Sequence, residues 1–305
     1  GLVDFLNIIR GHIDTDAAMT DVIPIQGMRS APHLDFAGEI KADTRFPTFH
    51  AARIADVATA RHAIASGKVD MIGMTRAHLA DPHLVRKIQL GQEQTIRPCV
   101  GATYCLDRIY MAGEALCIHN AATGRELTMP HVIPQADSAR RVVIIGAGPG
   151  GLEAARVCAE RGHSVTLLEA MPWAGGQLRL AARNPRRRDL MGIVEWRVAE
   201  LERLGVDVQY DTFADAQAVA ALQPDVVIVA TGGLPQNPEV ESGGELMISA
   251  WDVVGGDASP KGDVILFDDD GTHSSMTTAE ILARSGARVE IVTPESAATG
   301  ERHAH

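Results

Sequence analysis

The chain has 305 residues, of which 46% are apolar, so it is long enough for about two domains with buried cores. Its formal net charge of −11 argues against nucleic acid and against an anionic membrane surface as partners. Four unevenly spaced cysteines favour a reducing cytoplasm over a disulfide framework, and no apolar run approaches the ~18 residues of a membrane span.

The first 90 residues show about three strand–loop–helix units, a pattern typical of a parallel α/β structure. Apolar runs predict strands at 3–9, 45–50 and 69–74. Arg53 and Arg76 each follow the carboxyl end of one of these strands, which is the side on which parallel barrels bind ligands. Two arginines there suit a phosphate. The alternative is that both are ordinary solvated side chains.

Three of the four cysteines, Cys99, Cys105 and Cys117, lie within 19 residues, with glycines between them. Thiolates crowded in this way suggest a metal or iron–sulfur site. Five and eleven residues separate them, so the segment contains no CxxC motif. The alternative is that they are three small apolar residues packed in a compact loop. We expect Cys158, inside a predicted helix, to pack in the core.

A polar, proline-containing linker is predicted at 128–139, and a nucleotide-binding pattern follows it. Strand-forming residues at 142–145 lead into the sequence GAGPGG at 146–151. A helical segment, a second apolar run and an acidic residue, Glu169, then follow in that order. Strand, glycine loop, helix, strand and acid together predict a dinucleotide or ADP site, whereas a glycine-rich turn alone would be the alternative.

Each residue of this pattern has a physical role. Gly146 permits the tight turn, Gly148 lets a pyrophosphate approach the backbone, and Gly151 lets the helix lie close to the strand. The free N–H groups and the dipole of that helix face the phosphates. Glu169 can accept hydrogen bonds from both hydroxyls of an adenosine ribose, and it disfavours a 2′-phosphate there.

The remaining residues predict a glycine turn at 172–177, a helix at 190–204, and strands at 206–210 and 225–230. A second strand–helix–strand unit is predicted from residue 264, with strands at 264–267 and 288–292. Its loop, DDDGTHSSMT, has one glycine and three acids. Because three carboxylates repel a pyrophosphate, the loop disfavours nucleotide binding.

Together these motifs resemble the flavin oxidoreductases that join an Old Yellow Enzyme-type barrel to a nucleotide-binding region, the group of trimethylamine dehydrogenase, 2,4-dienoyl-CoA reductase and the N-methylproline demethylases. The resemblance covers essentially the whole chain, and MIGMTRAHLADP at 71–82 is its most characteristic part. It implies an α/β fold, with the C-terminal part of a TIM (β/α)8 barrel followed by a Rossmann-like FAD/NAD(P)-binding region. The implied divisions are the last three barrel units (1–95), a cysteine segment with linker (96–139), the FAD/ADP domain (140–260) and the start of a second nucleotide fold (261–305).

The resemblance also implies cofactor sites. FMN phosphate would be held by Arg53 and Arg76 with backbone near Ala52, and Cys99, Cys105 and Cys117 match three of the four cysteines of a [4Fe-4S] motif. Ala102 stands at the fourth position, which puts the cluster in question. The remaining cofactor-binding residues, for FMN and then for FAD or ADP, are Gly73, Thr75, Gly146, Gly148, Gly150, Gly151, Glu169, Gly176, Gln177, Ala230, Thr231 and Gly232.

The activity implied is that of an FMN-dependent oxidoreductase that passes electrons from a substrate toward an iron–sulfur and FAD or ADP module. The cysteine spacing resembles the demethylase branch, which favours oxidation of an N-methyl amine such as N-methylproline. The alternatives are an NAD(P)H-dependent 2,4-dienoyl-CoA-type reductase and an electron-transfer module without substrate chemistry. Expected partners are a small-molecule substrate and an electron-transfer protein. The resemblance implies a part of a protein about twice as long, with its catalytic acid or base outside this chain.

Overall fold

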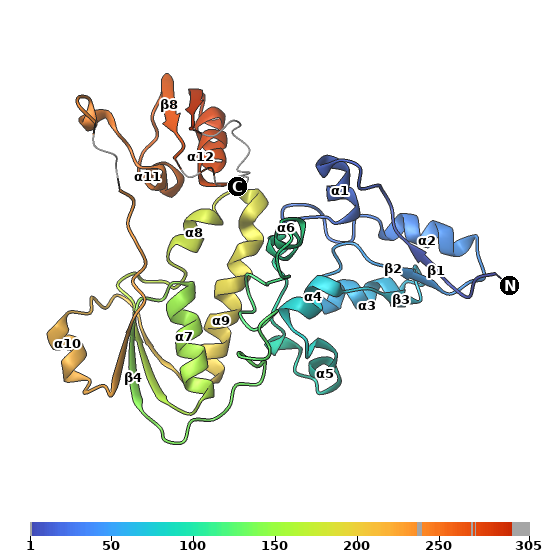
Figure 1. The fold of residues 1–305 in the computed structure, drawn as a ribbon, viewed down its shortest axis with the longest axis horizontal. Helices are drawn as coiled ribbons and strands as arrows, with labels where there is room; N and C mark the ends of the chain where they lie inside the picture. The colour runs from blue at the N-terminus through green and yellow to red at the C-terminus, as the bar shows by residue number, and fades with distance from the viewer. Residues whose placement is uncertain (1, 237–239, 270, 272, 295–305) are drawn as a thin grey trace. The chain divides into compact units, whose positions relative to one another are not determined.

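The structure is a computed structural model that describes residues 2–236, 240–269, 271 and 273–294 (Figure 1). It divides into two compact units. The first comprises residues 1–175 and 186–231, and the second comprises residues 176–185 and 232–305. Every sheet among the described residues is parallel, which confirms the α/β prediction.

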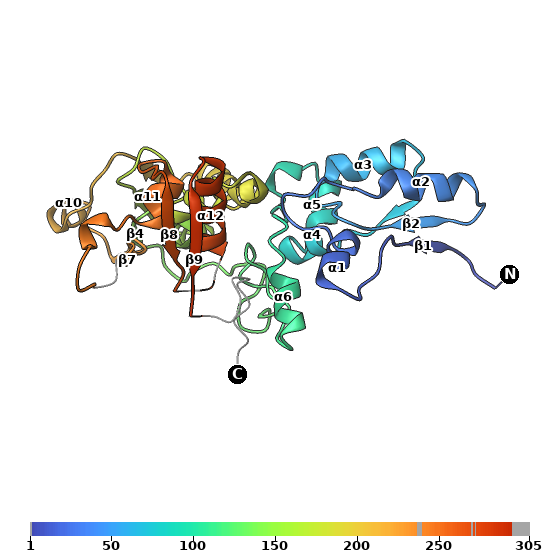
Figure 2. The same cartoon turned by 90° about the horizontal axis from the view of Figure 1, so that it is seen from above.

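The N-terminal part of the first unit is a parallel sheet in the order β1–β2–β3, covered on one face by helices α2 and α3 (Figure 2). The strands are shorter than predicted, because β2 offers only three residues for its neighbours to pair with. The core between the sheet and the helices contains Ile8, Leu34, Ile54 and Val69. The elements are β1 (Leu6–Ile8), α1 (Asp16–Val22), α2 (Leu34–Ala42), β2 (Thr48–His50), α3 (Val57–Ala65) and β3 (Met71–Ile72).

Short helices follow β3, and the buried carboxylate of Asp81 fixes them together. It accepts hydrogen bonds from the backbone N–H groups of His83 and Arg97, and it pairs with Lys87 at 2.6 Å. Residues 111–140 contain no helix or strand, and they lie inside the first unit. The helices are α4 (Thr75–Ala80), α5 (Leu84–Gln89), the 3-10 turn η1 (Glu93–Thr95) and α6 (Tyr104–Tyr110).

A second parallel sheet, in the order β6–β5–β4–β7, forms the rest of the first unit. Helices α7 and α9 pack against each other on one face, and α10 lies on the other (Figure 1). Because the chain order reverses at β4, the carboxyl ends of β4 and β7 form the crevice in which such sheets bind ligands. The elements are β4 (Arg141–Ile145), α7 (Pro149–Glu160), β5 (Ser164–Leu168), η2 (Pro185–Leu190), α9 (Met191–Arg203), β6 (Asp207–Gln209), α10 (Ala216–Ala221) and β7 (Val226–Val229).

The second unit contains the predicted strand–helix–strand motif, in which β8 pairs with β9 in parallel. Its core is formed by Val253, Leu282 and Ala287. The loop between β8 and α12 contains residues 270 and 272, which lie outside the described residues. The elements are α8 (Gln177–Ala181), η3 (Gly244–Leu246), α11 (Ala250–Gly255), β8 (Asp263–Phe267), α12 (His273–Arg284) and β9 (Arg288–Val292).

Candidate functional site

The glycine loop after β4 contains two positions that leave no room for a side chain and two that are open. Gly146 has a φ of +100°, and a Cβ there would lie 2.5 Å from the carbonyl oxygen of Ala230. A Cβ at Gly151 would collide with the carbonyl oxygen of Gly146. At Gly148 and Gly150, by contrast, nothing lies within 4 Å. The loop is therefore closed toward the sheet and open at the start of α7, where a phosphate group fits.

Glu169, at the end of β5, closes the same loop. Its carboxylate accepts hydrogen bonds from the backbone N–H of Ala147 at 2.6 Å and of Met171 at 2.8 Å. A carboxylate offers about four lone-pair sites, so two remain for the hydroxyls of a ribose. Glu169 therefore also orders the loop backbone, a role that the sequence pattern does not reveal.

The other predicted nucleotide contacts fall into both units. Ala230 donates its N–H to the carbonyl of Ile145 at 2.8 Å, and Thr231 follows it next to Gly146 in the first unit. In the second unit, Gly176 has a φ of +49°, and the Gln177 amide donates to the carbonyl of Gly233 at 3.0 Å. Gly232 has a φ of +71° and lies beside that amide.

The two predicted phosphate arginines lie near each other in the first unit. Ala52 and Arg53 have positive φ values of 122° and 49°, which turn the chain sharply after β2. Burial lowers the pKa of Arg76, and the charge of Arg53 lowers it further. Arg76 donates from one terminal nitrogen to the carbonyl of Pro24 at 2.8 Å, and its other terminal nitrogen is buried without a hydrogen-bond partner in the described part of the chain. A phosphate oxygen would satisfy that nitrogen.

Gly73 and Thr75, the other two residues predicted for this region, lie directly after β3 and at the start of α4. Gly73 donates its N–H to the carbonyl of His50 at 2.9 Å, and Thr75 begins α4, next to Arg76. Asp189, on η2, pairs with the Arg53 guanidinium. No sequence motif pointed to Asp189, because it lies 136 residues from its partner.

Removing the carboxylate of Asp189 is expected to free Arg53 for a phosphate. Because the Asp189 side chain is 45% exposed, its ion pair contributes at most about 1 kcal/mol. The substitution Asp189→Asn should therefore tighten FMN binding by up to about fivefold, measured by quenching of flavin fluorescence in the full-length apoprotein. Asp211→Asn, at an exposed position, is the control. Weaker FMN binding in Asp189→Asn would mean that Asp189 orients Arg53 instead of competing with the phosphate.

The three predicted cluster cysteines are half-buried, free thiols, and they lie close enough to influence one another. Burial raises the pKa of Cys99 and of Cys105, and each is raised further by the charge of Cys117. The charge of Arg76 opposes this in both. Among the described residues, no group of three or more Cys, His, Asp or Glu side chains is arranged to hold a single metal ion. Three thiols are the kind of ligand that iron–sulfur clusters use. Ala102 has no side chain that could act as the fourth ligand.

A buried ionic cluster next to the cysteine segment was not predicted. Glu153 on α7 pairs with Arg156 at 2.6 Å and with Arg197 on α9 at 2.9 Å. Arg197 also donates to the carbonyl of His119, whose backbone N–H lies 3.4 Å from the Cys117 sulfur. Burial lowers the pKa of His119 to about 3, so this imidazole is neutral. The spacing of Glu153 and Arg156 was a readable signal, since residues three apart on a helix share one face.

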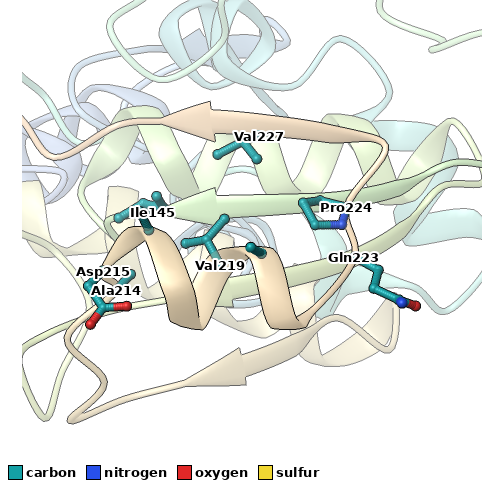
Figure 3. Close-up of a pocket in the computed structure, with 9 residues that line it drawn as sticks. Ile145, Ala214, Asp215, Val219, Gln223, Pro224 and Val227 are labelled. Carbon is teal, nitrogen blue, oxygen red and sulfur yellow. The ribbon is translucent and has the colours of Figure 1, made fainter.

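A hollow of about 590 Å³ lies between α10 and the strands β4 and β7 (Figure 3). Val219 and Val227 point into it, and its walls are mostly aliphatic. Its single carboxylate, Asp215, caps α10 by accepting from the N–H of Ala218 at 2.7 Å. The hollow therefore lacks the polar groups of a catalytic site.

None of the helices in the described part of the chain is long and apolar enough to cross a membrane.

Comparison with known proteins identifies relatives. A family model described as pyridine nucleotide-disulphide oxidoreductase matches residues 113–191 and 140–256. The chain is 63% identical, over 97% of its length, to a probable N-methylproline demethylase of Rhizobium meliloti (strain 1021), and 48% identical, also over 97%, to a multifunctional alkene reductase/demethylase of Caballeronia cordobensis. It covers 44% and 43% of these two relatives, so it spans less than half of their length.

A solved structure agrees with the sequence comparison. The structure of a 6-hydroxypseudooxynicotine amine oxidase from Pseudomonas geniculata N1 matches 90% of this chain with a TM-score of 0.81 and 30% identity. The chain covers 43% of that protein. The fold of most of this chain therefore resembles that of a segment of that larger protein.

Proposed function

Since the chain is a relative of the N-methylproline demethylases within the Old Yellow Enzyme-type flavin oxidoreductases, we propose that it forms part of a flavin-dependent enzyme that demethylates an N-methyl amine such as N-methylproline. One observation on the structure supports the proposal independently of the similarity to these relatives. The charges of Arg53 and Arg76 act on each other and on the Cys99 thiol, so the candidate phosphate site and the candidate cluster site are neighbours. Electron transfer from a phosphate-anchored flavin to a thiolate-held cluster needs that proximity.

The finer fold assignment is part of the same proposal. Residues 1–95 would be the last three units of a TIM barrel, which is supported by the parallel β1–β2–β3 order with an arginine after β2 and another after β3. Residues 96–139 would carry the cluster and linker, 140–260 the FAD- or ADP-binding domain, and 261–305 the start of a second nucleotide fold. The order β6–β5–β4–β7 and the open glycine loop support the third assignment.

The residues of this chain would anchor and orient the cofactors. Arg53 and Arg76, with backbone at Gly73 and Thr75, would hold the FMN phosphate as charge-assisted donors. The 146–151 loop and Glu169 would hold a pyrophosphate and a ribose. Cys99, Cys105 and Cys117 would hold a [4Fe-4S] or related cluster. When bound, the flavin supplies the hydride chemistry, and the protein supplies its orientation and electrostatic environment.

A specific finding favours a second activity, the reduction of an activated alkene. The relative from Caballeronia cordobensis is named as both an alkene reductase and a demethylase. In that case NAD(P)H would donate electrons and the flavin would pass them to an enoyl substrate. We also infer a small-molecule substrate, an electron-transfer protein as partner and a cytoplasmic location.

Reduction of the bound flavin in the full-length protein tests the proposal. N-methylproline should bleach the flavin absorbance anaerobically without NADPH, because an amine oxidation delivers hydride from the substrate. Bleaching by NADPH alone, followed by reoxidation with an enoyl compound, would support the alkene reductase instead. Iron and sulfide analysis of anaerobically purified protein tests the cluster, and Ala102→Cys should raise the iron content if the missing fourth thiol limits occupancy.

The proposed ribose contact gives a separate expectation for Glu169. Substituting Glu169→Ala should weaken ADP or FAD binding by about 1.5–3 kcal/mol, because charge-assisted hydrogen bonds to the ribose are lost. Isothermal titration calorimetry measures the affinity directly. Glu202→Ala, on the exposed side of α9, should leave it unchanged. An unaltered affinity in Glu169→Ala would remove the ribose assignment and leave Glu169 with the loop contacts alone.

A further inference from the structure

A polar cavity of about 370 Å³ lies within the first unit, and none of the residues proposed to hold a cofactor lines it. Its walls come from the segment that contains α5 and η1, and from the helices α7 and α9. The indole of Trp196, on α9, forms part of the wall and donates to the carbonyl of Thr95 at 3.1 Å. The cavity is therefore a separate feature that the proposed function does not use.

The side chains that line this cavity carry one more positive than negative charge, with the histidines left out of the count. Three basic side chains are already paired, since Lys87 lies 2.6 Å from Asp81, Arg156 3.0 Å from Glu160, and Arg203 2.7 Å from Glu200. Arg97 forms no ion pair with any side chain in the described part of the chain. Four lysine and arginine side chains minus three carboxylates give a net lining charge of +1, with the histidines left out of the count.

Arg97 is held in place without a direct carboxylate partner, and the charges of Glu153 and Asp81 act on it from a greater distance. Its backbone N–H donates to Asp81 at 2.9 Å, and its guanidinium lies over the Trp196 ring, 4.4 Å from the ring centroid. The Nε atom is buried and has no hydrogen-bond partner among the described residues. A planar guanidinium that is stacked on an aromatic ring and lacks a carboxylate partner is pre-organised to bind an oxyanion.

His83 provides a second group of the same kind. Its Nε2 atom is also buried without a partner in the part of the chain that the structure describes, and the residue lines the cavity. Its ring meets that of His131 edge to face, with centroids 6.3 Å apart. An imidazole N–H and a guanidinium together form a donor set that matches the oxygens of phosphate or carboxylate.

We propose that this cavity binds a small oxyanion, a phosphate or a carboxylate, with Arg97 as its main ligand and His83 as a second donor. The bound anion would offset the net positive charge of the lining and would lie beside the one lining arginine that forms no ion pair within the described part of the chain. The proposal is independent of the flavin chemistry, because it concerns other residues of the same unit.

The test is a titration of the full-length protein with its FMN and ADP bound, so that the proposed cofactor phosphate sites are already filled. Inorganic phosphate and acetate, each at constant ionic strength, distinguish the two oxyanions, and tryptophan fluorescence with calorimetry reports binding beside Trp196. We expect saturable binding of at least one anion. Arg97→Met should weaken it by about tenfold or more, since a charge-assisted hydrogen bond is lost. Arg86→Met, on the exposed side of α5, should bind as the parent does.

Two outcomes overturn the proposal: no saturable binding of either anion, or a folded Arg97→Met that binds as tightly as the parent. If Arg97→Met does not fold, crystals of the parent soaked in selenate, an analogue with anomalous scattering, decide instead. An anomalous peak within hydrogen-bond distance of the Arg97 guanidinium supports the site, and a data set without that peak overturns it.

Discussion

Replacing Gly151 with alanine is expected to destabilise the nucleotide-binding part of the first unit by about 3 kcal/mol or more. A Cβ at this position would collide with the carbonyl oxygen of Gly146 and lie 3.0 Å from the carbonyl carbon. Both atoms are backbone, so no side-chain rotation relieves the clash. The helix α7 would have to move away from β4, which opens the core beneath it. Urea unfolding followed by circular dichroism measures the loss.

Gly150→Ala is the matched control, because it changes the adjacent residue by the same methyl group. Nothing lies within 4 Å of a Cβ at Gly150, and the residue is already helical. We expect this variant to be as stable as the parent or more stable by up to about 1 kcal/mol, since alanine favours the helix. Equal stability of the two variants would show that the close approach of α7 to β4 is not needed for folding.

Removing the charge of Glu153 is expected to destabilise the first unit by about 3 kcal/mol. Its partners Arg156 and Arg197 have side chains only 6% and 5% exposed, so they would be left as buried cations. Arg156 would retain Glu160, at 3.0 Å, whereas Arg197 would have no carboxylate partner in the described part of the chain. Glu153→Gln keeps the volume of the side chain and isolates the effect of charge. Glu195→Gln, on the exposed side of the same α9 helix as Arg197, should change stability by no more than about 0.5 kcal/mol.

The lowered pKa of Glu153 predicts that the stability of the first unit depends on pH. Burial alone would raise the pKa of Glu153, but the Arg156 hydrogen bond and the charges of Arg197 and Arg156 outweigh it and lower the pKa to about 2. A carboxyl group with a lowered pKa in the folded state stabilises it fully above the ordinary value of 4.5. This contribution is lost as the pH falls toward 2. The stability difference between parent and Glu153→Gln should therefore shrink by about 1.4 kcal/mol per pH unit in that window. A difference that stays constant from pH 5 to pH 3 would contradict it.

Local patterns in the sequence predicted the position of the glycine loop between β4 and α7, but they did not predict the ion pairs around it. The glycines of the 146–151 loop could be assigned because the turn and the helix packing leave room only for hydrogen at Gly146 and Gly151. The strand ends were less predictable. Val3 and Phe5 are apolar but exposed, and pairing with β2 starts only at Leu6.

Contacts between distant residues could not be read from the sequence. Asp189 meets Arg53 across 136 residues, and Glu153 meets Arg197 across 44. No spacing rule connects such pairs, because the tertiary fold alone brings them together. The proposed phosphate role of Arg53 and Arg76 came from the likeness to a known group, since their positions after two strands only suggested it.

The hydrogen bond from the Trp196 indole to the Thr95 carbonyl also bears on how the protein is made. It joins residues 101 positions apart, so the wall beside Thr95 cannot be completed until α9 has left the ribosome. At a synthesis rate of ~5–20 residues per second, that delay is roughly 5–20 s. During this interval Arg97 has no ring to stack on and the Thr95 segment is exposed to solvent. The protease resistance of the segment around Thr95 should therefore appear only once residues up to about 200 have emerged.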